Sequence, residues 1–330
     1  MADRRSRILR ATSEAARIRD MFPYGKRTGF DIIHATAALG FPVLFRPIRN
    51  LLGGTVVVDD DARGILITTN RGLGTQRFTL AHELGHIVMD HRTQFDGPES
   101  DSASLGGNPI PIEEQAAESF ASELLAPKSR IVQLANRYGW KAPRLREPSI
   151  VYQLALRMGV SFRAMCWSLF GANILPLAAA RGLAENTNLQ EVKRAANAGL
   201  QLPDPKTDVW MLTPSDSGSI IEAGPFDVFV TELIDRSSSG FLWDLDGAKT
   251  GFEISQERGS IGEEYGGDVS RRLILRAKET GSLNLELADR RPWNNEAAAR
   301  VEILVQNYGP EESGLARQVK RALLEGGGAS

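Results

Sequence analysis

Residues 77–91 read RFTLAHELGHIVMDH, and this stretch holds three of the four histidines in the chain. His82 and His86 lie four positions apart, and Glu83 directly follows the first of them. On a helix two such histidines occupy one face, so both imidazoles can reach one ion. A carboxylate beside them can take a proton from a water molecule without binding the metal itself. The spacing therefore predicts a metal-binding helix on which Glu83 is the general base.

Apolar residues around the motif indicate a helix independently of the histidines. Leu80, Leu84 and Val88 recur along one face of such a helix, and Thr79 is the expected N-cap. The alternative is a surface helix that carries the H-E-x-x-H pattern by chance. We favour the metal site because the surrounding sequence has the helical pattern that the motif requires.

A second helix is expected to supply another ligand. Residues 111–127 read PIEEQAAESFASELLAP, with one proline suited to a first helical turn and another that ends the helix. A catalytic zinc ion needs three protein ligands and an open fourth position. The single cysteine, Cys166, cannot form an internal disulfide or a four-cysteine zinc site. Any metal must therefore be held by histidines and carboxylates, and Cys166 is expected in the core.

Together the two segments resemble the ImmA/IrrE family of metallopeptidases. The similarity is carried by residues 77–86 and by the pattern Glu114, Ala117, Phe120 before the helix-ending Pro127. It extends over roughly residues 10–180. Members of this family typically cut and inactivate helix-turn-helix repressors, in mobile-element control or in the response to DNA damage. The resemblance implies a mainly helical, thermolysin-like (gluzincin) metallopeptidase domain with a small β-sheet.

The same resemblance implies roles for single residues. His82, His86 and Glu114 would hold one Zn2+ ion per chain, and Glu83 would be the general base. Glu113 is the alternative to Glu114, and its simpler role is that of an acidic residue favouring the helix N-terminus.

Three further residues are candidates for supporting roles. Glu118 follows Glu114 by one helical turn, where it can accept a hydrogen bond from a ligand imidazole or be a solvated surface charge. His91 can assist catalysis or be a helix-end imidazole that the helix dipole stabilises. His91 and Tyr24 are both candidates for stabilising an oxyanion.

The rest of the first half mixes helices with a short extended section. Helices are expected at residues 3–21 and 30–39, a strand at 41–45, and a hairpin formed by 55–58 and 64–69.

Two short helices broken at Gly159 are expected in residues 150–175 and resemble a helix-turn-helix. This segment is also typical of the ImmA/IrrE family. In one interpretation it binds DNA through Arg157 and Arg163. In the other, which we favour, its apolar residues pack a helical subdomain beside the active site.

Beyond residue 208 the pattern changes to alternation. Residues 283–287 (LNLEL) and 301–306 (VEILVQ) alternate apolar with mostly polar side chains, as half-buried strands do. Further short strands are expected at 226–234, 241–245 and 272–277. Closely spaced strands of this kind predict an antiparallel, all-β immunoglobulin-like sandwich.

Three loop motifs in this half resemble those of the chagasin family of cysteine-peptidase inhibitors, which insert three neighbouring loops of a sandwich into a papain-like active site. The resemblance covers roughly residues 215–308. Its loop residues are Ser238, Ser239, Gly240, Gly266, Gly267, Arg291, Pro292 and Trp293. The first loop lacks the Asn and the Pro that the family usually has, which removes a rigid, pre-organised turn. The simpler roles are core packing for Trp243 and Trp293 and turn geometry for the glycines.

The expected organisation is α+β and multidomain. It comprises a metallopeptidase domain at 1–182 that includes the helix-turn-helix-like segment, a linker at 183–208, a chagasin-like β-sandwich at 209–308, and a C-terminal helix and tail at 309–330.

Charge differs between the halves. Residues 1–207 carry a formal charge of +6 and residues 208–330 carry −8, which add to the net charge of −2. The asymmetry indicates separate partners for the two halves, or docking of one on the other. No apolar run is long enough to cross a bilayer, and no secretory signal follows the N-terminus. We therefore expect a cytoplasmic protein with no membrane partner.

Three functional hypotheses follow. The first is a zinc endopeptidase that cleaves a helix-turn-helix repressor in a stress-response or mobile-element switch, with the C-terminal sandwich recruiting the substrate or gating the site. The second is a cysteine-peptidase inhibitor or protein-binding module whose metal domain is a sensor. The third is a DNA-binding regulator. We favour the first.

Overall fold

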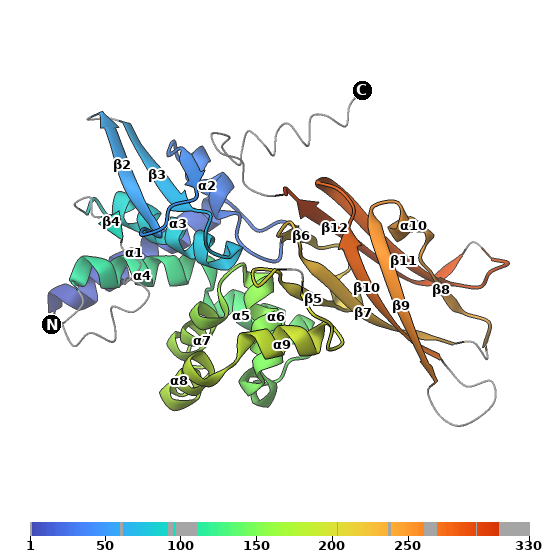
Figure 1. Cartoon of the computed structure of the whole chain (residues 1–330). Helices are drawn as coiled ribbons and strands as arrows, with labels where there is room; N and C mark the ends of the chain where they lie inside the picture. Colours follow the sequence, from blue (N-terminus) through green and yellow to red (C-terminus); the bar gives the residue numbers. More distant parts are fainter. Residues whose placement is uncertain are drawn as a thin grey trace. The chain divides into compact units, whose positions relative to one another are not determined.

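The structure is a computed structural model (Figure 1). It describes residues 2–59, 62–91, 95–96, 111–202, 204–236, 239–260, 269–294 and 296–309. Within these residues the chain forms two compact units, which meet between Thr187 and Asn188. The helix expected within residues 309–330 lies almost wholly outside the described residues.

A four-stranded sheet forms one part of the first unit. Its strands are β1 (Val43–Arg46), β2 (Gly53–Asp59), β3 (Ala62–Thr68) and β4 (Phe95–Asp96). The order across the sheet is β1-β3-β2-β4. The hairpin expected from residues 55–58 and 64–69 is present as β2 and β3, with Thr55 opposite Ile65. β1 pairs parallel to β3, which the alternation of apolar residues alone did not indicate.

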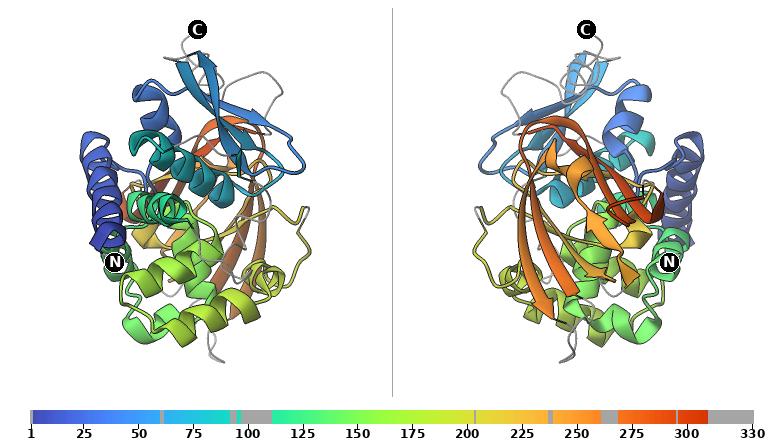
Figure 2. Two further views of the ribbon diagram at one scale, coloured as in Figure 1. Left: turned by 90° about the vertical axis from the view of Figure 1, so that its left-hand side faces the viewer. Right: turned by 90° about the vertical axis from the view of Figure 1, so that its right-hand side faces the viewer.

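Helices form the rest of the first unit. They are α1 (Ala2–Met21), α2 (Ile32–Ala38), α3 (Leu73–Val88), α4 (Ile112–Leu125), α5 (Lys128–Arg137), the 3-10 helix η2 (Ala142–Arg146), α6 (Pro148–Met158), α7 (Phe162–Gly171) and α8 (Leu177–Asn186). α1 packs along α4 (Figure 2). Its inner face is formed by Ala11, Ala15 and Ile18, which are fully buried and recur at helical spacing.

Helix α3 begins earlier than the sequence indicates. Thr79 was expected to cap it, but that prediction is wrong, because the helix starts at Leu73 with Gly72 as its N-cap and Thr79 lies buried inside it. Gly74 reads as a helix breaker, yet a Cβ there would lie 2.5 Å from the carbonyl carbon of Val160. The glycine therefore allows a close approach of two backbone segments within the helix.

Helices α6 and α7 occupy the segment expected to resemble a helix-turn-helix, and Gly159 between them has the left-handed conformation. Arg157 is fully buried. Its guanidinium carbon lies 4.4 Å from the ring centroid of Tyr138, and its Nη1 donates to Oε1 of Gln153 at 3.0 Å. This arginine is thus part of the core and does not face a solvent-accessible surface. Cys166 is also buried, and burial raises the pKa of its thiol to about 12.

The second unit consists of strands apart from short helical segments. Its strands are β5 (Val209–Leu212), β6 (Ile220–Ala223), β7 (Val228–Asp235), β8 (Leu242–Asp244), β9 (Phe252–Ser260), β10 (Val269–Ala277), β11 (Gly281–Arg290) and β12 (Ala297–Asn307). They form two sheets of order β5-β7-β10-β9 and β6-β12-β11-β8. The helical segments are α9 (Leu189–Ala196), η3 (Pro214–Asp216) and α10 (Asp246–Lys249).

The strand pairs differ in part from an antiparallel sandwich. The remaining pairs are antiparallel, but β5 runs parallel to β7 and β6 runs parallel to β12. Along β11 the expected alternation places Leu283, Leu285 and Leu287 in the core. Phe229 stacks on Trp210 at 6.5 Å between centroids and meets Phe252 edge-on at 6.0 Å.

The segment 183–208, expected to be a linker, contains helix α9. From residue 188 onward it belongs to the second unit. Here Ala196, Ala198 and Leu202 pack against a buried cluster of sheet residues, which are Val209, Val228, Val230 and Ile274. Asn188 caps α9 by accepting from the backbone N–H groups of the first turn, so a polar composition conceals a regular helix.

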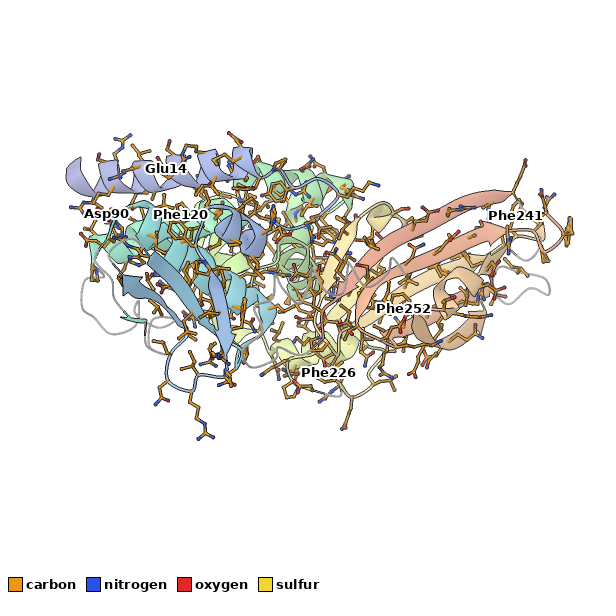
Figure 3. All side chains as sticks on the ribbon, turned by 90° about the horizontal axis from the view of Figure 1, so that it is seen from above. Glu14, Asp90, Phe120, Phe226, Phe241 and Phe252 are labelled. Atoms are coloured by element: carbon orange, nitrogen blue, oxygen red, sulfur yellow. The ribbon has the colours of Figure 1, made fainter. Side chains whose placement is uncertain are left out.

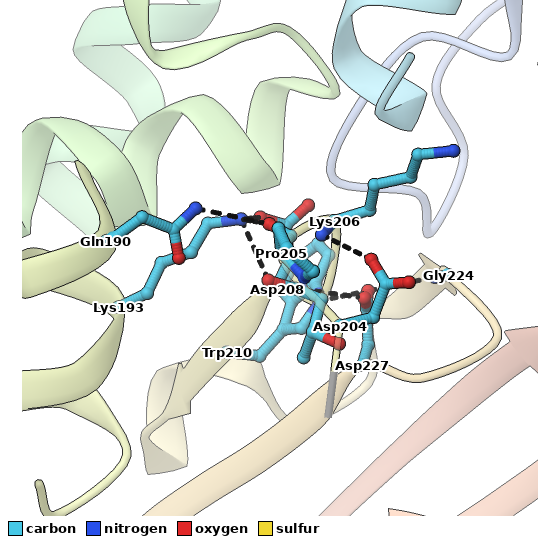
Figure 4. A network of polar contacts seen from close by, with 10 residues as sticks. Gln190, Lys193, Asp204, Pro205, Lys206, Asp208, Trp210, Gly224 and Asp227 are labelled. Atoms are coloured by element: carbon cyan, nitrogen blue, oxygen red, sulfur yellow. Dashed lines mark hydrogen bonds and ion pairs between the residues drawn. The ribbon is translucent and has the colours of Figure 1, made fainter. Parts of the chain in front are cut away.

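A polar network fixes α9 to the strands (Figure 4). Lys193 is 5% exposed, and its Nζ lies 2.9 Å from Oδ1 of Asp208 and 2.8 Å from the carbonyl oxygen of Thr207. Asp227 in turn accepts from the backbone N of Asp208 at 3.0 Å and from Nε1 of Trp210 at 3.0 Å. A buried charge with such partners is specific to one docked geometry.

Candidate metal centre

Helix α3 brings two histidines of the H-E-x-x-H motif to one point. The Nε2 atoms of His82 and His86 lie 3.0 Å apart. Glu114, in the first turn of α4, reaches the same point with both oxygens. Its Oε2 lies 3.2 Å from Nε2 of His82, and its Oε1 lies 3.5 Å from Nε2 of His86. One ligand atom from each of these residues lies within 4.8 Å of the others.

These separations suit a metal ion. Zinc ligands at about 2.0–2.1 Å in a tetrahedron are separated from each other by about 3.3 Å. The observed separations of 3.0, 3.2 and 3.5 Å bracket that value. Two imidazoles and one carboxylate also form a ligand set that leaves a fourth position for water or substrate. The residues present therefore fit a zinc ion.

The two acidic candidates at the start of α4 have different partners. Glu113 forms an ion pair of 2.7 Å with Arg7 of α1. Glu114 is hydrogen-bonded to both imidazoles, and the hydrogen bonds with His82 and His86 hold the pKa of its carboxyl far below the usual value. The carboxylate that joins the histidines is thus Glu114.

A close crossing of α3 and α4 sets the position of Glu114. Phe120 of α4 is fully buried between these elements (Figure 3). A Cβ at Gly85 would lie 3.0 Å from Cδ1 and 3.2 Å from Cγ of the Phe120 ring. Glycine at this position lets the two helices approach each other, and the approach places Glu114 beside the histidines.

Glu83 is 2% exposed, and a neighbour from the sheet holds its carboxylate. The hydroxyl of Thr55, on β2, donates to Oε2 of Glu83 at 3.0 Å. Thr55 was not singled out from the sequence. The available signal was a polar residue at the start of the apolar run Val56 to Val58, in a strand expected to pack under the helix.

The supporting candidates are placed differently. His91 lies with its Nδ1 3.1 Å from Nδ1 of His86. Glu118 is exposed and has no hydrogen bond or ion pair with any described residue. Tyr24 is not in the cluster. Its ring lies under the guanidinium of Arg130 at 4.4 Å, and burial raises the pKa of its hydroxyl to about 12, so Tyr24 is protonated at neutral pH.

The loop residues expected in the second unit are described only in part. Ser238, Gly266 and Gly267 lie outside the described residues. Trp293 is 75% exposed and is not a core residue. A Cβ at Gly240, whose φ is +75°, would lie 2.9 Å from Cη2 of Trp293, so the structure brings the first and third loops together.

Charged residues hold this end of the second unit in shape. Arg271 is 6% exposed and pairs with Asp235 at 2.7 Å. Asp235 also accepts from the backbone N of Trp243 at 2.8 Å. Phe241, at the end of the strands in Figure 3, has a guanidinium carbon 4.7 Å from its ring centroid from each of two arginines, Arg236 and Arg291. Pro292 follows Arg291 and is exposed, and Ser239 donates from its hydroxyl to the carbonyl of Arg236 at 2.9 Å.

Comparison with known proteins defines the class of the first unit. Residues 36–170 match the family model Peptidase_M78, described as the IrrE N-terminal-like domain. This part of the chain therefore belongs to the IrrE N-terminal-like peptidase family, as the two helix motifs predict. No curated protein matches the chain significantly.

Among solved structures, three are similar to part of the chain. The cysteine protease inhibitor EhICP2 from Entamoeba histolytica is 17% identical, with a TM-score of 0.29 over 32% of this chain and 99% of that chain. Amebosin is 18% identical, with a TM-score of 0.24 over 29% and 95%. PbICP-C, solved in complex with falcipain-2, is 11% identical, with a TM-score of 0.21 over 33% and 95%. Among the described helices, none has the length and apolar character needed to span a bilayer.

Proposed function

We propose that the first unit is a zinc-dependent endopeptidase that cleaves a helix-turn-helix transcriptional repressor. The observation that carries this proposal is the convergence of His82, His86 and Glu114 next to the buried Glu83. The match to a peptidase family supports a protein substrate. The repressor, the stress-response or mobile-element setting and the cytoplasmic location come from the family resemblance of the two helix motifs.

The residues of the chain have distinct tasks in this mechanism. A bound zinc ion supplies the Lewis acid that polarises a peptide carbonyl and makes water a nucleophile near neutral pH. Glu83 takes the proton of the attacking water and passes it to the leaving amine. Thr55 holds the Glu83 carboxylate through its hydroxyl. Tight burial of Glu83 excludes bulk water from that carboxylate.

The test is a comparison of wild type, Glu83→Gln and Glu118→Gln. We expect Glu83→Gln to bind zinc normally and to lower cleavage by about 100-fold or more, because the general base is lost. Glu118→Gln should cleave normally, since Glu118 is exposed and has no described partner. In cells, the substrate is the protein that is shortened or lost with wild type but not with Glu83→Gln. Equal proteolysis by Glu83→Gln would refute the proposal.

The second unit is proposed to recruit the substrate or to gate the site. Its net acidic charge opposes the basic first half, and screening by salt weakens attraction between such charges. Raising the salt concentration should therefore increase cleavage if acidic residues of the second unit restrain the peptidase. A decrease in cleavage by the full chain, with unchanged zinc content, would argue against gating.

A second candidate function is protein binding by the loop end of the second unit. The exposed Trp293 above Gly240, and Phe241 between two guanidinium groups, form a fixed aromatic and cationic surface. Such residues are enriched at binding hot spots. If this surface inhibits papain-type peptidases, Trp293→Ala should weaken inhibition by about tenfold or more. Failure of the wild-type chain to inhibit any of a panel at micromolar concentration would exclude that activity.

DNA binding through residues 150–175 is not favoured. Arg157 was one of the two arginines expected to contact DNA, and it is fully buried against Tyr138. Arg163 is exposed, but one arginine does not make a basic surface of the kind that duplex binding needs.

A further inference from the structure

The C-terminus of α3 turns the chain back over the metal-binding helix. The backbone N of Asp90 bonds to the carbonyl oxygen of Ile87 at 3.1 Å, and the backbone N of His91 bonds to that of His86 at 2.9 Å. Asp90 has a φ of +57°, in the left-handed region. These features define a Schellman motif. The motif returns the chain to the last turn of α3, so His91 lies next to His86 although it is five residues further along.

The two imidazoles meet through one specific pair of atoms. Nδ1 of His91 lies 3.1 Å from Nδ1 of His86, with the ring centroids 5.1 Å apart and the planes at 71°. His86 points its Nε2 at His82 and Glu114. If Nε2 of His86 binds a metal, its Nδ1 must carry the proton and needs an acceptor. Nδ1 of His91 is at hydrogen-bonding distance for that role, and the proton of His91 is then on its Nε2.

We infer that His91 is a positioning residue for the metal centre, which accepts the Nδ1–H of His86 and thereby fixes the tautomer and the ring orientation with which His86 binds the metal. Metal-binding histidines commonly donate their second N–H to a carboxylate, a carbonyl or a water. Here a neutral imidazole has that place. The inference rests on the metal site of the proposed function, but it concerns metal affinity and not the cleavage step.

Two substitutions separate the hydrogen bond from the bulk of the ring. His91→Phe keeps a planar ring but has no acceptor. His91→Asn offers a side-chain oxygen near the position of Nδ1, which can accept the same proton. His34→Phe is the matched control, because His34 is exposed on α2 and its ring contacts Phe22 edge-on.

The measurements are the zinc dissociation constant, from competition with a chelator, and the visible absorption spectrum of the cobalt-loaded protein. We expect His91→Phe to bind zinc about 10- to 100-fold more weakly and to change the cobalt spectrum. His91→Asn should recover most of the affinity, and His34→Phe should match wild type. Zinc affinity of His91→Phe within about twofold of wild type would overturn the inference, as would equal weakening by His91→Phe and His91→Asn.

Folding and function are kept apart from this result. Helical circular dichroism of the metal-free proteins identifies a variant that fails to fold, and His91→Ala then replaces His91→Phe in the same comparison. If zinc affinity follows the expected order while Glu83→Gln still cleaves substrate, the proposed mechanism fails and the role of His91 stands. A wild-type chain that binds no zinc overturns both the role of His91 and the metal-dependent mechanism.

Discussion

Gly85→Ala tests whether the close crossing of α3 and α4 positions the metal ligands. The new methyl group would lie 3.0 Å from Cδ1 and 3.3 Å from Cβ of Phe120. Ordinary carbon contacts are at about 3.5–4.0 Å, so the ring must move by several tenths of an ångström. Phe120 is fully buried and cannot turn out to solvent. Helix α4 must therefore shift, and Glu114 shifts with it.

Two opposing effects determine the size of the change. Alanine is favoured over glycine in a helix interior by about 1 kcal/mol. An extra methyl group in a tightly packed core costs about 1–3 kcal/mol. We expect a net loss of about 1 kcal/mol in the unfolding free energy of the first unit. The displacement of Glu114 should also weaken zinc binding by about tenfold, the lower end of the effect of disturbed ligand support.

Gly182→Ala, in α8, is the matched control. No atom lies within 4 Å of the position its Cβ would occupy, so only the helix propensity changes and the first unit should gain about 1 kcal/mol. Urea unfolding followed by helical circular dichroism measures both variants, and chelator competition measures their zinc affinity. If Gly85→Ala is as stable as Gly182→Ala and binds zinc as wild type does, the packing argument is refuted.

Three other predictions concern single contacts. Burial and the charge of Asp208 raise the pKa of Asp227 to about 6. Its contribution to stability should therefore be fully present below about pH 4 and be lost as the pH rises through 6, so the unfolding free energy of wild type minus that of Asp227→Asn should fall between pH 4 and 7 and would be flat if Asp227 titrated normally. Asp90→Gly should stabilise the first unit by up to about 1 kcal/mol in thermal unfolding, because glycine adopts a positive φ without steric cost; a loss of stability would show that the Asp90 side chain matters more than its backbone. Arg271→Met should destabilise the second unit by about 3 kcal/mol in urea, since it leaves the Asp235 charge buried without its cation. Adding Asp235→Asn should then recover part of the loss, and a fully additive loss would contradict the pairing.

The metal-binding helix was predictable from sequence because its signal is local. The spacing of His82 and His86 and the apolar stripe beside them depend only on helical periodicity. The choice between Glu113 and Glu114 needed the tertiary structure, in which Arg7 pairs with Glu113 and the histidines bond to Glu114.

Features that depend on contacts distant in sequence were missed. Gly74 looks like a helix breaker until the backbone of Val160 is placed against it. Thr55 became relevant only when β2 was placed beside α3, where its hydroxyl reaches Glu83. Lys193 has the sequence signature of a solvated charge, but its burial depends on Asp208, fifteen residues later. No periodic pattern reports such pairs.

In the second unit the alternation of β11 identified the buried leucines correctly, since the period of two is a local property. The same pattern did not reveal which edge strands run parallel, because direction depends on the connections between strands and not on their faces. Trp293 likewise has the residue type of a core tryptophan, and only the positive φ of Gly240 and the close approach of the indole show that it lies on the surface.

The docking of α9 has a consequence for how the second unit can be inherited or transplanted. A recombination that joined another protein to this chain at residue 209 would leave behind Ala196, Ala198 and Leu202, and would expose the apolar patch they cover around Val228 and Val230. A junction in the turn between α8 and α9 leaves that cover in place. The smallest portable unit therefore begins at Asn188, and selection for solubility should keep α9 with the strands whenever they move to a new neighbour.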